Sequence, residues 1–247
     1  MCTLSRLTSK DLMSAYNKKT WTASGCIADH KKVVSNLGKI LDAYVGPNSI
    51  EPSLNEAVMV TVNSVNSCPY CEGLHGQLAR MAGVDEPEAL QSSESVEACR
   101  QVVDHPAITY ARRFAETNGR GEGSEGAFEV LKESEGAGRA SSIRALCWFL
   151  LWGSIGGNTT NAFLSRLRGK PRAGSSFLFE LIFFLYYAPL FALIAVVNAL
   201  LRFAPKVPAW FSASFGVLLT VIASVWIIPL GIVALLIPAK PRVLATS

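Results

Sequence analysis

The chain has 247 residues, of which half are apolar and 17% are charged, with a net charge of +4. An ordinary soluble domain has about 25% charged residues, and the excess apolar content lies after residue 176. We therefore expect a soluble part followed by a membrane-like part. The basic residues form no long run with interleaved aromatic residues, which excludes nucleic acid as an expected partner.

Residues 1–28 show no helical or strand periodicity, and we expect an irregular N-terminal arm. This stretch is basic and rich in hydroxyl residues, and its longest apolar run before residue 25 has two residues. A secretory signal peptide needs a longer apolar region, so none is expected here. An organelle transit peptide is the alternative that this composition leaves open.

The first helix is expected from His30 to Val45, where apolar residues recur at helical spacing until Gly46-Pro47. Ser53 could cap the next helix, with Glu56 three residues later as in a capping box. This second helix contains the β-branched run VMVTV, which also fits a buried strand.

A further helix is predicted from about Cys68 to Met81, because Pro69 stands at a favoured first-turn position. Shorter amphipathic helices are predicted at 94–103, 106–118 and 124–133, and a longer one at 141–167 with an apolar centre that is too short to span a bilayer. No segment alternates as a series of strands would. The soluble part, residues 29–170, is therefore expected to be one all-α domain.

Two uncharged stretches follow, with 21 residues at 181–201 and 31 residues at 209–239. About 20 helical residues cross a bilayer, so we predict transmembrane helices at 177–203 and 209–238. The outer flanks hold six cations and the connecting segment two. The positive-inside rule then places the soluble domain and the C-terminus on the cytosolic or an equivalent reducing side; the sequence does not indicate an organelle.

Cys68 and Cys71 form a C-x-x-C pair for which three chemistries fit poorly. A c-type haem needs a histidine directly after the second cysteine, but Glu72 stands there. A structural disulfide within this pair would close a trivial loop and add little stability. A zinc site needs four ligands, and the pair supplies two. The candidates for the missing ligands, none at a recognised spacing, are His75, Cys99 and His105.

A redox-active thiol pair explains more of the pattern. A helix N-terminus favours a thiolate, and the predicted helix begins at these cysteines. His75 follows Cys71 by four residues, so it lies on the same helix face one turn later. Cys68 is near enough to resolve an oxidised Cys71 as a disulfide. Cys147, in the apolar centre of the 141–167 helix, is expected to be an inert buried thiol, and the aromatic residues beside it to be core.

Glu56, Cys68, Cys71 and His75 together fit the pattern E-x11-C-x-x-C-x-x-x-H. With the stretch NSCPYCEGLH, the A-R-x-F-A helix near residue 113 and the segment WFLLWGSIGGNTTNAFLSRL, the chain resembles the alkylhydroperoxidase-D-like group of the carboxymuconolactone decarboxylase family over residues 30–168. The resemblance implies a small all-helical domain that oligomerises and that needs no cofactor beyond an external dithiol reductant.

The resemblance also implies roles for the four residues. Cys71 would attack a hydroperoxide and become a sulfenic acid, and Cys68 would resolve it as a disulfide. His75 and Glu56 would form a proton relay. The peroxidase prototype has a second histidine between its cysteines, where this chain has Tyr70.

The sequence thus predicts a membrane-anchored enzyme, either a thiol-dependent peroxidase of the peroxiredoxin type or a dithiol–disulfide oxidoreductase. Its expected partners are a hydroperoxide or disulfide substrate, a dithiol reductant protein, the membrane and further copies of itself. The alternative is a non-enzymatic membrane protein in which the helical domain mediates assembly and the thiols act as a redox switch or a metal clip.

Overall fold

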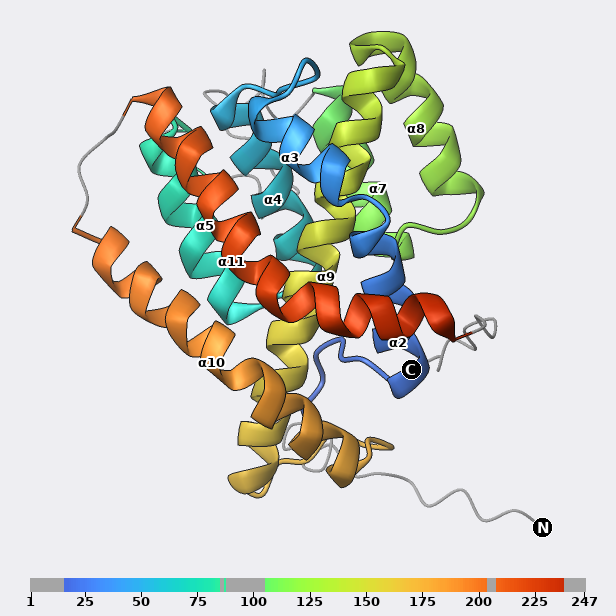
Figure 1. Ribbon diagram of the computed structural model, residues 1–247, viewed down its shortest axis with the longest axis vertical. Helices are drawn as coiled ribbons and strands as arrows, with labels where there is room; N and C mark the ends of the chain where they lie inside the picture. The colour runs from blue at the N-terminus through green and yellow to red at the C-terminus, as the bar shows by residue number, and fades with distance from the viewer. Residues whose placement is uncertain (1–15, 85–86, 88–104, 204–207, 238–247) are drawn as a thin grey trace.

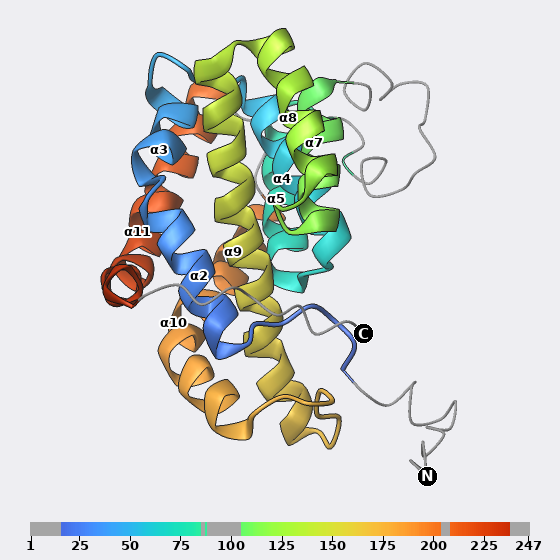
Figure 2. The same cartoon turned by 90° about the vertical axis from the view of Figure 1, so that its right-hand side faces the viewer.

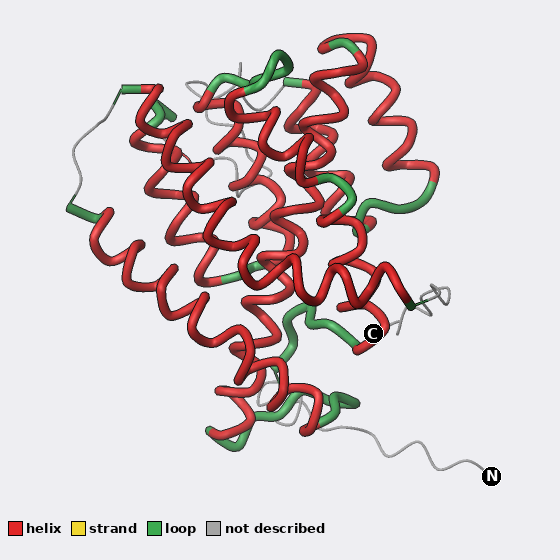
Figure 3. Tube along the Cα trace, viewed as in Figure 1, coloured by secondary structure: helices red, strands yellow, loops and turns green. Residues whose placement is uncertain are grey.

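The computed structural model describes residues 16–84, 87, 105–203 and 208–237 (Figure 1). Within these ranges the chain forms nine α-helices and no strand (Figure 3), which confirms the all-α prediction. The helices are α2 (Ala23–Val34), α3 (Leu37–Val45), α4 (Pro52–Asn66), α5 (Pro69–Met81), α7 (Pro106–Thr117), α8 (Glu122–Glu135), α9 (Ala137–Leu167), α10 (Phe177–Leu201) and α11 (Ala209–Leu236).

Helix α9 is the centre of the molecule (Figures 1 and 2). It contacts α2, α3, α4, α5, α7, α8 and α10, because its apolar residues occur all round the helix rather than on one face. The predicted core helix is therefore confirmed, although it begins at Ala137 rather than at Ser141.

The single helix predicted from His30 to Val45 is wrong, because two helices cover this part of the chain. Helix α2 begins at Ala23, where Thr22 caps it by accepting a hydrogen bond from the Gly25 amide at 3.1 Å. It ends before Ser35 and Asn36, whose side chains donate to the carbonyls of Lys31 and Lys32 at 2.8 and 2.7 Å. Such local side-chain bonds compete with the continuing helix, and α3 then starts at Leu37.

Helix α4 begins at Pro52, so the predicted cap at Ser53 is wrong. Glu51 is the cap residue and makes no side-chain capping bond; proline at the first helical position fixes the start instead. Glu56 is therefore inside the helix and is not a capping residue. The run VMVTV is helical and buried between α5, α7 and α9, so packing overrides its β propensity.

The predicted helices at 68–81, 106–118 and 124–133 are confirmed as α5, α7 and α8. The helix predicted at 94–103 lies outside the described residues. The turn between α7 and α8 uses a left-handed Asn118 followed by two glycines with positive φ, Gly119 and Gly121.

Helices α10 and α11 are each long and apolar enough to cross a membrane, by length and composition. They nevertheless pack on the helical domain more than on each other: α10 lies along α5 and α9, and α11 along α2 and α3. Both run on one side of α9, with α8 on the other (Figures 1 and 2). Their outward faces expose large apolar side chains, from Phe177 to Ile237.

The inward face of α10 carries polar groups that are paired with the domain. Glu180, which is 2% exposed, accepts from Nε of Arg166 at 2.7 Å. The Tyr187 hydroxyl contacts Nε2 of His30, to which Trp152 donates at 3.0 Å. Burial lowers the pKa of His30 to about 4, so this imidazole is neutral, with its proton on Nδ1 facing the Cys26 carbonyl at 2.6 Å. Helix α10 is therefore an integral part of the packed domain.

We predict that Arg166→Met lowers the free energy of unfolding by about 3 kcal/mol, because it leaves the buried Glu180 carboxylate without its cation. The matched control is Arg168→Met, since Arg168 is exposed and should change stability by less than about 0.5 kcal/mol. Denaturant unfolding of the full chain in detergent micelles measures both. An equal response of the two variants would show that α10 is not docked as described.

Candidate active site

The turn from α4 to α5 places the cysteine pair. Ser67 ends α4 in the left-handed conformation, with φ 54° and ψ 43°. Asn63 then accepts from the Cys68 amide at 3.2 Å, and Cys68 becomes the cap residue of α5. Its Sγ accepts from the Cys71 amide at 3.4 Å. Both thiols therefore lie in the first turn of α5, as the sequence predicts.

Cys68 is fully buried against α9 because Gly157 makes room for it. A Cβ at Gly157 would lie 2.6 Å from Sγ of Cys68 and 3.2 Å from the rings of Tyr70 and Phe191. No role in the site was predicted for Gly157. Glycine in a helix interior is the available signal for such a close approach.

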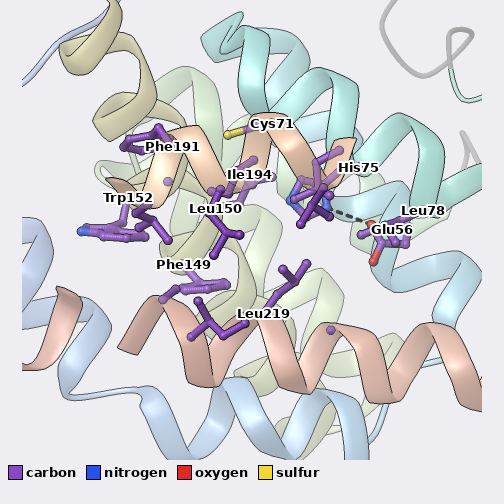
Figure 4. Close-up of a pocket in the computed structure, with 18 of the residues that line it drawn as sticks. Glu56, Cys71, His75, Leu78, Phe149, Leu150, Trp152, Phe191, Ile194 and Leu219 are labelled. Carbon is purple, nitrogen blue, oxygen red and sulfur yellow. Dashed lines mark hydrogen bonds and ion pairs between the residues drawn. The ribbon is translucent and has the colours of Figure 1, made fainter. Parts of the chain in front are cut away.

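Glu56 and His75 form a buried hydrogen-bonded pair between α4 and α5 (Figure 4). Nδ1 of His75 and Oε2 of Glu56 are 2.9 Å apart, and the two residues are 9% and 2% exposed. If Nδ1 carries the proton that the carboxylate accepts, Nε2 is the nitrogen left to exchange a proton with a substrate. The structure therefore brings Glu56, His75 and the cysteine pair together.

The two thiols have different electrostatic surroundings. Burial opposes ionisation of Cys68, but hydrogen bonds from the Cys71 thiol and from the amides of Cys71 and Tyr70, with the charge of Lys18, lower its pKa below the ordinary value. The pKa of Cys71 is raised well above the ordinary value, first by its hydrogen bond to Cys68 and then by burial. The reduced pair therefore favours a thiolate on Cys68, with Cys71 as its hydrogen-bond donor.

A cavity of about 70 Å³ opens on Cys71, His75 and Glu56. Cys68 is not among its lining residues. In Figure 4, Cys71 lies across the cavity from Phe149 of α9 and Leu219 of α11. Helices α3, α5 and α9 supply part of the remaining wall. Helices α10 and α11 supply the rest, with Leu190, Phe191, Leu193, Ile194, Val197, Gly216, Leu219, Ile222 and Ala223. These residues were not predicted as part of the site, because nothing in their own sequence shows which helix they cover.

The other singled-out residues are placed as follows. Cys147 is buried in α9, and burial raises the pKa of its thiol. Cys26 is buried beside His30, while Cys2 and Cys99 lie outside the described residues. Phe149 and Trp152, interpreted as core, also line the cavity. Tyr70 is partly buried and packs on Phe191, with ring centroids 5.3 Å apart.

Within the part of the chain that the structure describes, no group of three or more His, Cys, Asp and Glu side chains is close enough to hold a metal ion. The zinc alternative would therefore need a ligand from outside this part, such as Cys99. The four site residues instead form two interacting pairs, one of thiols and one of a carboxylate with an imidazole.

Residues 29–117 match the model of the carboxymuconolactone decarboxylase family. The matched segment, which runs from α2 to the end of α7, is similar to that family, as the motif indicated. It contains all four site residues. Neither the comparison with curated proteins nor that with solved structures gives a match.

We predict that Cys71→Ala raises the pKa of Cys68, because the thiolate loses the hydrogen bond from the Cys71 thiol. Cys68→Ala should lower the pKa of Cys71, because the group that most raises it is gone. Titration of the ultraviolet absorbance of thiolates measures both shifts, with Cys147→Ala as the control for a thiol outside the pair. Identical titration curves for both pair variants would contradict the coupling.

Proposed function

We propose that this protein is a thiol-dependent peroxidase that uses Cys71 and Cys68 as a dithiol–disulfide couple. The observation that supports this proposal best is the cavity. It exposes Cys71 together with the His75–Glu56 pair, and Cys68 lies behind Cys71, outside the cavity lining. A nucleophile, a proton relay and a resolving group are the three parts that reduction of a hydroperoxide requires.

The first step cleaves the O–O bond. Cys71 transfers its proton to the Cys68 thiolate or to His75, and its sulfur attacks the terminal oxygen of the hydroperoxide. That oxygen becomes the sulfenic acid of Cys71, and the other leaves as an alkoxide, which takes the transferred proton to give the alcohol. Glu56 accepts from Nδ1 of His75 and so favours the imidazolium during the transfer.

The second step forms the disulfide. The Cys68 thiolate attacks the sulfur of the sulfenic acid and displaces hydroxide. The hydroxide takes up a proton from solvent, which replaces the proton that Cys68 released when it ionised, and leaves as water. Two thiols and one hydroperoxide thus give one disulfide, one alcohol and one water. An external dithiol then reduces the disulfide by thiol–disulfide exchange. The same thiol pair would serve a dithiol–disulfide oxidoreductase. The presence of Tyr70 instead of a second histidine affects this activity least.

Membrane attachment through α10 and α11 is part of this proposal, since both are long and apolar enough to span. We place the redox domain and the C-terminus on the cytosolic or equivalent reducing side. The positive-inside argument counts Arg166 among the cations that flank the two helices. Because Arg166 is paired with Glu180, it contributes less to the excess of positive charge that predicts this side. Self-association is expected from the family resemblance.

The test is consumption of an alkyl hydroperoxide by the full chain in detergent with dithiothreitol as the reductant. Cys71→Ser should abolish turnover. In the absence of dithiothreitol, Cys68→Ser should consume one equivalent of hydroperoxide and keep a sulfenic acid that dimedone detects, because no second thiol resolves it. His75→Gln and Glu56→Gln should each lower the rate, by about 100-fold or more for the histidine.

Cys147→Ala is the control, because this thiol is buried away from the cavity, and it should retain full activity. Turnover that survives Cys71→Ser would refute the mechanism. No turnover in the unaltered protein, together with one bound zinc per chain, would favour the non-enzymatic metal clip.

A further inference from the structure

The polar part of the cavity wall is the part that holds the proposed catalytic residues. Glu56, Cys71 and His75 stand at one part of its wall, and aliphatic and aromatic side chains make up nearly all of the rest. Cys71 itself is 5% exposed, so a substrate reaches its sulfur through this apolar space. A hydrated group that enters loses its water without gaining polar partners beyond the site residues.

Over the cavity, α10 and α11 present apolar side chains both inward and outward. Inward residues of α10 and α11 line it, and their outward residues are exposed. Leu193 does both: it lines the cavity and is 40% exposed, so it stands where the cavity wall meets the outer surface. Helices α10 and α11 contact each other little, so few contacts close the gap between them.

The size of the cavity limits what can enter it. Apolar protein cavities of about 150 Å³ bind benzene, and this one has about 70 Å³. It therefore holds a peroxide group with only a few carbon atoms, and the rest of a larger substrate must lie outside. The surface at the rim is apolar, so the outer part of the substrate is apolar as well.

We infer that the substrate class is a hydroperoxide carried on a long apolar chain, such as an oxidised acyl chain, which enters between α10 and α11. Its peroxide group reaches Cys71 in the cavity, and its remaining carbons lie along the outward apolar surface of the two helices. This inference rests on the proposed peroxidase function and specifies its substrate.

Gly153 of α9 offers a variant that fills the cavity. It lines the cavity, and a Cβ added there would meet no atom within 4 Å. Gly153→Leu therefore adds a side chain without a backbone clash, and leucine favours the helix more than glycine does. The matched control is Gly126→Leu on α8, where an added Cβ also meets no atom within 4 Å and the residue is exposed.

The experiment uses the reduced full chain in detergent micelles and measures, by mass spectrometry, how fast the Cys68–Cys71 disulfide forms. Linoleic acid hydroperoxide should oxidise the pair at least about tenfold faster than hydrogen peroxide. Gly153→Leu should slow the reaction with linoleic acid hydroperoxide by about tenfold or more. It should change the reaction with hydrogen peroxide by less than about twofold, and Gly126→Leu should change neither.

Two results would overturn the inference in distinguishable ways. If hydrogen peroxide reacts as fast as the lipid hydroperoxide and Gly153→Leu slows neither selectively, the substrate class is wrong while the peroxidase function stands. If no hydroperoxide forms the disulfide, the proposed function fails and the inference fails with it.

Discussion

The packing of two apolar helices onto the helical domain is the constraint on which the site depends. Helices α10 and α11 cover α2, α3, α5 and α9, and without them the inward residues that wall the cavity would be absent. Specific polar contacts fix this packing: Glu180 meets Arg166 and Tyr187 meets His30. A buried carboxylate is costly without its cation, so these contacts determine which face of α10 turns inward.

This cover changes the chemistry of the thiol pair. An apolar roof excludes water, and burial alone disfavours a thiolate. Hydrogen bonds offset this effect of burial at Cys68. The amides at the start of α5 and the Cys71 thiol donate to its sulfur, so the negative charge is favoured on the thiol that does not line the cavity. The pKa of Cys71 is raised, so Cys71 is the hydrogen-bond donor in the reduced pair.

Local signals in the sequence predicted much of the molecule. Pro69 marks the start of α5, and the spacing from Cys68 to His75 places the thiols and the imidazole on adjacent turns. The break between α2 and α3 was missed, because apolar periodicity continues across Ser35 and Asn36 while their side chains bond back to the helix. Glu56 was predicted as a site residue from the motif, although its capping interpretation was wrong.

The walls of the site could not be predicted, because they depend on contacts between distant segments. An uncharged run such as 209–239 satisfies the criteria for a membrane helix whether or not one face packs on a domain. Only the assembled structure shows that Gly157 makes room for Cys68 and that Gly231 of α11 approaches Val34 of α2.

The most direct test of the account is a cross-link between α2 and α11. A Cβ at Gly231 would lie 3.0 Å from Cβ of Val34, so a shift of less than about 1 Å gives the separation of about 3.8 Å found in disulfides. The double variant Val34→Cys with Gly231→Cys should form a disulfide under mild oxidation, detected as a joined peptide by mass spectrometry. The pair Val34→Cys with Ile232→Cys should not, since Ile232 is 52% exposed. Failure of the first pair, or equal linking of both, would show that α11 does not cover the domain.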